Sequence, residues 1–233
     1  NLLEENNDYI EFEKEMFKNM IRKTSFSASI DESKGIITGL LIEMEEDSIN
    51  MVAIDGYRMA IAREKKKNSK SQNIIISAKI LNEISKILTE IDTEENFIKI
   101  IINEKKAVLL IENLKIVLSL LSGDFIKYKE VLPKENKCKA QINRKELIDS
   151  IERASLLSKE GKNNLVKFAI NENTLTINSK SEEGTVKEEI NISKEGENIE
   201  IGFNAKYVLD AIKAVEDEEI VMVFNTSISP CLI

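Results

Sequence analysis

The chain has 233 residues, of which 42% are hydrophobic and 32% charged, and its formal net charge is −8 at pH 7. This composition predicts one or two globular domains with apolar cores, and no run approaches the roughly 18 apolar residues of a membrane-spanning helix. Histidine is absent and the two cysteines, Cys138 and Cys231, lie far apart, which excludes Ser-His-Asp and Cys-His catalysis and histidine metal sites.

Two pairs of similar segments predict four amphipathic helices. Residues 14–27 (KEMFKNMIRKTSFS) and 145–158 (KELIDSIERASLLS) carry apolar residues in the same register at helical spacing. Residues 77–88 (SAKILNEISKIL) resemble 204–215 (NAKYVLDAIKAV). The helices are expected to start near residues 14, 78, 144 and 204, with Ser77 and Asn204 as N-caps.

The segments between these helices are short, rich in Ile and Val, and separated by turn residues, which indicates antiparallel strands. The predicted strands cover residues 36–45, 48–54, 57–64, 96–103, 106–112, 114–121, 165–171, 174–179, 186–193, 219–225 and 227–233. The chain is therefore predicted to be an α+β protein of four units, each a helix followed by about three strands. Two units form each domain, and the boundary falls near residues 130–140.

The segment MVAIDGYRMAIARE (51–64) has an unusual turn. Asp55-Gly56 between two apolar runs predicts a tight β-hairpin. A turn requires neither the aromatic Tyr57 nor the basic Arg58 that follow. The local pattern leaves open whether the segment is only a tight turn or presents these side chains for binding.

Three motifs give the chain a family resemblance. The turn DGYRMA (55–60), the run SGDFIKYKEVLP (122–133) and the helix start FNAKYVLDAIKAV (203–215) resemble the beta sliding clamp of bacterial DNA polymerase III, in order and spacing. The resemblance implies the DNA clamp fold, with two of the three domains of a protomer. Residues 1–8 would end a linker from a missing first domain, residues 9–132 form the middle domain, and residues 133–233 form the C-terminal domain without its last strand.

The resemblance also implies a function. Two protomers of that family close into a ring around duplex DNA, helices line the hole, and the ring holds DNA polymerase on its template. The helix cations expected to face DNA are Lys14, Lys18, Arg22, Lys23, Lys79, Lys86, Arg144, Lys145, Arg153, Lys206 and Lys213. Acidic residues on the same helices would make this lining partial, which suits weak, salt-sensitive contact.

A second implied site is a pocket between the middle and C-terminal domains that binds short linear peptides of polymerase III, other polymerases, the clamp loader and repair factors. The positions that match it are Ile37, Ile54, Gly56, Tyr57, Arg58, Met59, Ile126, Val131, Ser229 and Pro230. Apolar walls with a few oriented polar groups suit such a pocket, and methionine adapts to varied ligands. Tyr57, Ile54 and Ile126 depart from the residues common in the family, which leaves the peptide preference open.

The remaining expectations concern assembly, chemistry and location. Leu156 and Leu157 fall at the family's dimer interface, so the full-length protein is expected to be a homodimer. We expect a cytoplasmic replication protein that is not an enzyme and has no cofactor, no metal and no membrane contact. Two alternatives stay open: a protein-binding scaffold without DNA contact, and an enzyme on a duplicated α+β scaffold in which Asp55 acts with Glu43 or Glu45.

Overall fold

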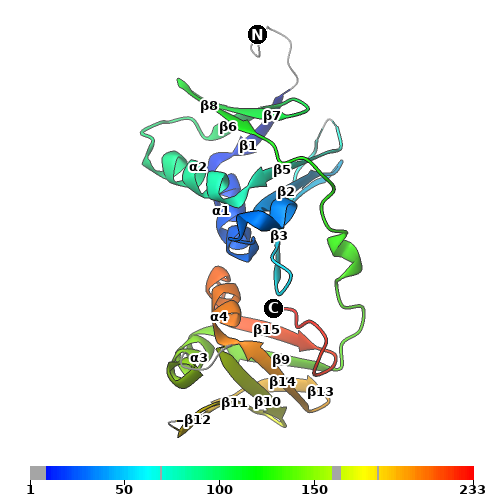
Figure 1. Ribbon diagram of the computed structural model, residues 1–233, viewed down its shortest axis with the longest axis vertical. Coiled ribbons are helices and arrows are strands. Elements are labelled where there is room, and N and C mark those ends of the chain that lie inside the picture. Colours follow the sequence, from blue (N-terminus) through cyan, green and yellow to red (C-terminus); the bar gives the residue numbers. More distant parts are fainter. Residues whose placement is uncertain (1–8, 69, 159–163, 183) are drawn as a thin grey trace. The chain divides into compact units, whose positions relative to one another are not determined.

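The computed structural model describes residues 9–68, 70–158, 164–182 and 184–233, and the side chains of residues 157 and 158 lie outside the description. The expected linker at residues 1–8 also lies outside it. Packing divides the chain into two compact units, residues 1–126 and 127–233, which we call unit 1 and unit 2 (Figure 1). The predicted domain limits, 9–132 and 133–233, stay a prediction.

Unit 1 contains two four-stranded antiparallel sheets, with strand orders β1-β6-β7-β8 and β4-β3-β2-β5. Its elements are β1 (Tyr9–Glu13), α1 (Lys14–Thr24), the 3₁₀ segments η1 (Ser25–Ser27) and η2 (Glu32–Thr38), β2 (Gly39–Met44), β3 (Ser48–Ile54), β4 (Met59–Lys65), β5 (Gln72–Ser77), α2 (Ala78–Glu90), β6 (Phe97–Ile102), β7 (Lys106–Ile111) and β8 (Leu114–Ser119).

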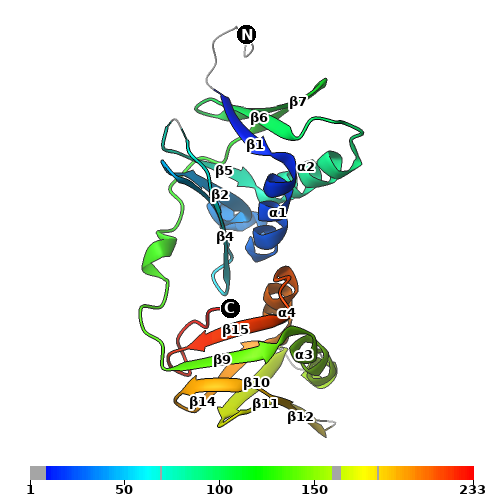
Figure 2. The same ribbon diagram turned by 180° about the vertical axis from the view of Figure 1, so that it is seen from behind.

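Unit 2 has a similar plan, with a four-stranded sheet of order β12-β11-β10-β14 and a three-stranded sheet of order β13-β9-β15 (Figure 2). Its elements are η3 (Tyr128–Glu130), β9 (Cys138–Asn143), α3 (Arg144–Ser158), β10 (Leu165–Asn171), β11 (Thr174–Ser181), β12 (Gly184–Asn191), β13 (Ser193–Gly196), β14 (Ile199–Asn204), α4 (Ala205–Ala214) and β15 (Glu219–Phe224).

Each half of unit 1 is a strand, a helix and three strands, and the two halves exchange their first strands. β1 pairs with β6 of the second half, and β5 pairs with β2 of the first half. In unit 2, β9 pairs with β15 and β14 pairs with β10 in the same way. Neither half therefore completes its own sheet, so the pair of halves is the structural unit.

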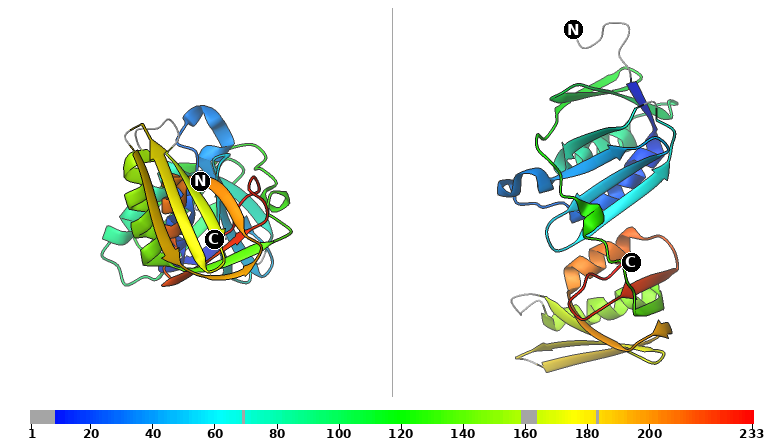
Figure 3. Two further views of the ribbon diagram at one scale, coloured as in Figure 1. Left: turned by 90° about the horizontal axis from the view of Figure 1, so that it is seen from below. Right: turned by 90° about the vertical axis from the view of Figure 1, so that its right-hand side faces the viewer.

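Each unit has one apolar core between its helices and sheets. The helix α1 buries Phe17, Met20 and Ile21, whose spacing of three and four residues places them on one face. In unit 1 these side chains pack with strand residues of both sheets, and Figure 3 (right) shows the strands curving over the helices. Phe12 of β1 meets Phe17 edge-on, with ring centroids 5.2 Å apart. Burial of this face leaves the opposite face of each helix to the charged residues.

The predicted helix starts are confirmed, because the four α-helices begin at Lys14, Ala78, Arg144 and Ala205. The predicted cap at Asn204 is also correct: its Oδ1 accepts from the backbone N–H groups of Lys206 and Tyr207. The predicted cap at Ser77 is wrong, because its side chain makes no capping hydrogen bond. At Ser77 the chain passes from β5 directly into α2, and the strand pairing orients the helix start instead.

Two strand predictions need correction. The strand that precedes each helix was not expected, so each half of unit 1 has four strands per helix rather than three. In unit 2, a single strand, β15, follows α4 within the described residues. The segment 227–233 was expected to be a strand, but within the described residues it forms a single bridge, between Leu232 and Val223. Pro230 has no N–H for a sheet ladder, which disfavours an earlier strand start.

Both cysteines are free thiols. Burial raises the pKa of Cys138 and raises the pKa of Cys231 to about 12, so neither forms an appreciable thiolate near pH 7. In the part of the chain that the structure describes, no helix is long and apolar enough to cross a membrane.

Candidate functional site

The hairpin turn between β3 and β4 holds five of the predicted pocket residues together. Ile54 pairs with Met59 at the end of the ladder, and the Asp55 N–H donates to the Arg58 carbonyl at 3.2 Å. Gly56 has a φ of +95°, and no atom lies within 4 Å of where a Cβ would stand. Glycine is therefore required by the backbone conformation, not by crowding.

The carboxylate of Asp55 organises the residues after the glycine. Its Oδ1 accepts from the backbone N–H groups of Tyr57 at 2.9 Å and Arg58 at 3.0 Å. Its Oδ2 accepts from Arg58 Nε at 3.0 Å. The Arg58 guanidinium also lies over the ring of Phe26, with Cζ 5.4 Å from the ring centroid. Sequence reasoning included Arg58 but missed Asp55 and Phe26 as its partners.

The exposure of these residues separates two roles. Tyr57 is 83% exposed, whereas Ile54 is only 7% exposed. Met59 is partly exposed and ends the ladder beside Ile54. The turn therefore offers an aromatic ring to solvent beside a thioether, above a mostly buried isoleucine.

Two further predicted residues come from other segments of unit 1. Ile37 lies in η2, is half-buried, and accepts a hydrogen bond from the Ser29 N–H on its carbonyl at 2.9 Å. Ile126 is 39% exposed. It follows Gly123, whose Cβ position would lie 3.7 Å from Ile36 of η2. The structure thus ties the segment before Ile126 to η2.

The remaining predicted pocket residues belong to unit 2. Val131 is 47% exposed, and its N–H donates to the Tyr128 carbonyl of η3. Ser229 closes a turn, since its Oγ lies 2.6 Å from Thr226 Oγ1, and Pro230 follows on the surface. The same turn projects Ile228, which is 94% exposed and was missed from the sequence. An isoleucine between two serines at a turn was the available signal.

The helices are the basic part of this acidic chain. The four α-helices carry 11 Lys and Arg residues against 7 Asp and Glu residues, a net charge of +4 where the whole chain has −8. On α1, Lys14, Lys18 and Arg22 are spaced by four residues and form one stripe along the side of the buried face. Lys14, Lys23 and Lys79 form no ion pair with a carboxylate among the described residues.

Most of the other predicted DNA-facing cations are already paired. The pairs are Lys18 with Glu15 (2.9 Å), Lys86 with Glu83 (2.8 Å), Lys145 with Asp149 (2.8 Å), Arg153 with Glu188 (2.6 Å), Lys206 with Asp210 (3.8 Å) and Lys213 with Glu152 (2.6 Å). Except for the side chains of Lys18, Glu188 and Asp210, these groups are widely exposed, so the pairs are weak and salt screens them.

Two arginines of α3 have structural partners. The Arg153 guanidinium bonds Glu188 of β12 and Ser150 Oγ, and its hydrogen bond lowers the pKa of the Glu188 carboxyl. Arg144 donates through Nε to the Ile212 carbonyl at 3.1 Å, at the C-terminal end of α4. Both side chains therefore join α3 to neighbouring elements of unit 2.

The two predicted dimer residues lie in the last turn of α3. Leu156 is 65% exposed, which is unusual for leucine on a helix with a buried face. The side chain of Leu157 lies outside the description. No group of three or more His, Cys, Asp or Glu residues in the described parts of the chain is arranged to hold a metal ion.

Comparisons with known proteins cover nearly the whole chain. The family described as "DNA polymerase III beta subunit, central domain" matches residues 11–127, and "DNA polymerase III beta subunit, C-terminal domain" matches residues 129–233. The beta sliding clamp of Bacillus subtilis is 34% identical over 229 residues, which are 96% of this chain and 60% of that protein. The beta sliding clamp of a Staphylococcus epidermidis strain is 31% identical over 97% of this chain and 60% of its own length.

The fold agrees with these sequence matches. The crystal structure of the DNA polymerase III beta subunit from Thermotoga maritima superposes with a TM-score of 0.92 at 32% identity, covering 98% of this chain and 62% of that one. The α+β clamp fold expected from the sequence is confirmed. The chain spans about 60% of the length of the curated relatives it matches.

Proposed function

Because the chain belongs to the DNA polymerase III beta subunit family, we propose that the whole protein is a DNA polymerase processivity factor, a sliding clamp that encircles duplex DNA. The observation that carries this proposal is the succession of two family domains, central and then C-terminal, along one chain. We propose 9–132 and 133–233 as their limits. The protein acts by binding and has no active site. It works in the cytoplasm as a homodimer, with Leu156 and Leu157 at the interface.

The helix cations are proposed to face the DNA. The excess of +4 on the helices supports this assignment, because the rest of the chain carries −12 and would repel phosphates. Local pairing of most cations keeps each contact weak. A clamp that moves along DNA needs contacts of this kind, while the closed ring prevents the protein from dissociating from the DNA.

Topological binding is the decisive test of the function. The whole protein, loaded by its clamp loader and ATP onto nicked circular DNA, is expected to co-elute with the DNA in gel filtration. Cutting the circle with a restriction enzyme is expected to release most of the protein, because a ring slides off a free end. A protein that stays bound after linearisation, or never binds the circle, contradicts the proposal.

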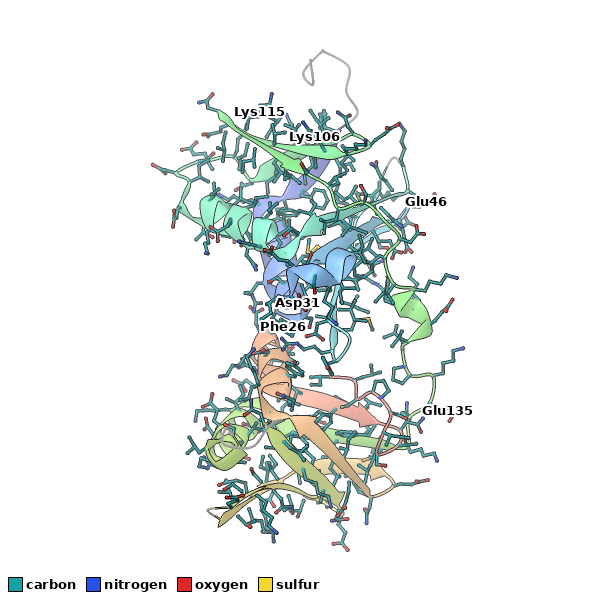
Figure 4. The ribbon with its side chains drawn as sticks, viewed as in Figure 1. Phe26, Asp31, Glu46, Lys106, Lys115 and Glu135 are labelled. Carbon is teal, nitrogen blue, oxygen red and sulfur yellow. The ribbon has the colours of Figure 1, made fainter. Side chains whose placement is uncertain are left out.

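The basic stripe on α1 gives a second prediction. Replacing Lys14 and Lys18 by glutamine is expected to weaken DNA binding and to make the slope of log K against log salt shallower by about 1.8 at most. The matched control replaces Lys106 and Lys115, which lie on the strands β7 and β8 and are labelled in Figure 4. Fluorescence anisotropy with a labelled duplex measures both variants.

The two double variants remove the same charge, so they separate a local contact from a general field effect. An equal loss of DNA affinity in both double variants would show that DNA does not bind preferentially at the α1 stripe. Unchanged DNA affinity in both double variants would favour the alternative of a protein-binding scaffold without DNA contact.

We further propose that the candidate pocket residues in each unit contact short apolar peptides of polymerases and other partners. Met59 and Tyr57 offer adaptable apolar surface at the hairpin turn. A labelled peptide with leucine and phenylalanine side chains is expected to bind the protein with a Kd in the micromolar class, near −8 kcal/mol. Met59→Asp is expected to raise this Kd by at least about tenfold, since it places a charge in an apolar contact.

The control for this prediction is Val117→Asp, which adds the same charge to a half-exposed position on β8. Its peptide affinity is expected to equal that of the wild type. Saturable binding that is lost equally in both variants would remove the assignment of the pocket to the hairpin turn.

A further inference from the structure

The Asp55 carboxylate makes three hydrogen bonds inside one turn. It holds the backbone N–H groups of Tyr57 and Arg58 through Oδ1, and Arg58 Nε through Oδ2. The Asp55 side chain is 11% exposed and the Arg58 side chain is 14% exposed. An ion pair this shielded is screened far less by solvent and salt than the pairs on the helices.

A second element restrains the same guanidinium. Phe26, labelled in Figure 4, lies in η1, directly after α1. The Arg58 guanidinium stands over its ring, with Cζ 5.4 Å from the ring centroid. The planar guanidinium therefore has a carboxylate at its Nε and an aromatic ring against its face. Two elements that are distant in sequence thus fix one side chain, and arginine offers the planar face and the Nε–H donor that lysine lacks.

We infer that Asp55 and Phe26 are positioning residues that brace Arg58 and thereby hold the exposed Tyr57 in place for an incoming peptide; this inference rests on the proposed function. Ordering a long side chain before binding removes an entropic cost that would otherwise fall on the complex. The brace therefore contributes to affinity without itself touching the peptide.

The hairpin does not depend on the brace for its fold. The ladder ends at the Ile54–Met59 pair, and the bond from Asp55 N–H to the Arg58 carbonyl closes the turn through the backbone. Removing the carboxylate is thus expected to leave the strands paired while the Arg58 and Tyr57 side chains become mobile. This separation makes the inference testable.

Asp55→Asn is the primary variant, because it keeps an acceptor for the turn amides and removes the negative charge at Nε. Its Kd for the labelled leucine- and phenylalanine-containing peptide is expected to rise about three- to tenfold. Phe26→Leu, which removes the aromatic face but keeps an apolar side chain, is expected to show a smaller rise. In an Arg58→Gln background, Asp55→Asn is expected to have no further effect.

The double-mutant cycle of Asp55→Asn and Arg58→Gln distinguishes a positioning role of Asp55 from a purely structural one. If Asp55 acts through Arg58, the double variant binds as Arg58→Gln alone does. Multiplicative effects of the two substitutions would overturn the inference, and so would an Asp55→Asn variant that binds as the wild type does.

A measurement without peptide tests whether Asp55 and Phe26 hold Arg58 in place, independently of whether the protein binds peptides. The chain has five arginines, so five Nε–H signals are expected in a ¹H–¹⁵N spectrum and can be assigned by substitution. The Arg58 signal is expected to exchange slowly with water in the wild type and rapidly in Asp55→Asn, with unchanged backbone signals. Rapid exchange in the wild type would overturn the brace. Slow exchange without peptide binding by the wild type would instead retain the brace and remove its link to peptides.

Discussion

Phe17→Ala is expected to lower the free energy of unfolding of unit 1 by about 3–5 kcal/mol. Phe17 is fully buried on α1 and meets the ring of Phe12 on β1 edge-on at 5.2 Å. Truncation removes apolar burial, leaves a cavity and loses the aromatic contact between the helix and the exchanged strand. Urea unfolding followed by circular dichroism measures the change, since the chain has no tryptophan.

The matched control for this prediction is Phe17→Leu, which keeps most of the volume and is expected to cost less than about 1.5 kcal/mol. Because α1 carries Lys14 and Lys18, Phe17→Ala is also expected to weaken DNA binding under conditions in which unit 1 is partly unfolded. An alanine variant as stable as the leucine variant would show that α1 is not anchored through this side chain.

Gly196→Ala is expected to destabilise unit 2 by at least about 3 kcal/mol. Gly196 ends β13 with a φ of +91°, and a Cβ there would stand 2.0 Å from the Lys137 carbonyl oxygen. That oxygen accepts the Glu197 N–H at 2.8 Å, and Gly196 pairs with Cys138 of β9. The clashing atoms are backbone, so the pairing of β13 with β9 must open to admit the methyl group.

Gly35→Ala separates this clash from backbone strain. Gly35 has a φ of +59° and a ψ of −117°, and no atom lies within 4 Å of its Cβ position, so only the conformational cost of about 1–3 kcal/mol is expected. Thermal and urea unfolding of Gly196→Ala and Gly35→Ala measure the two losses in the free energy of unfolding. Equal costs would mean that the backbone beside Lys137 moves aside freely.

The helices could be predicted from the sequence because their apolar residues repeat at helical spacing over at least three turns. The strands that precede them could not. β1 reads YIEFE and β9 reads CKAQIN, and each runs into its helix without a turn residue between Glu13 and Lys14 or between Asn143 and Arg144. Five or six residues give too short an alternation to recognise when no Gly or Pro marks where it ends.

The candidate site shows the same limit. The turn at Asp55-Gly56 follows from local chemistry, and family resemblance singled out the residues beside it. The contact of Arg58 with Phe26 joins residues 32 positions apart, and the pair of Lys213 with Glu152 joins residues 61 apart. Such contacts depend on how the elements pack, so the sequence showed the cations of the helices but not their neutralisation.

The exchange of first strands between the halves of a unit has a consequence during synthesis. Phe12 of β1 is paired with Ile98 of β6, the one strand that borders β1 in the described part of the chain, so β1 leaves the ribosome long before that strand exists. At typical translation rates this delay is on the order of ten seconds. Until then the apolar side of β1 has no sheet to join, and contacts this distant in sequence form slowly even in a complete chain. The nascent chain is therefore most prone to misassociation between the synthesis of β1 and that of β6. A ribosome-bound chaperone would have its largest effect during this period.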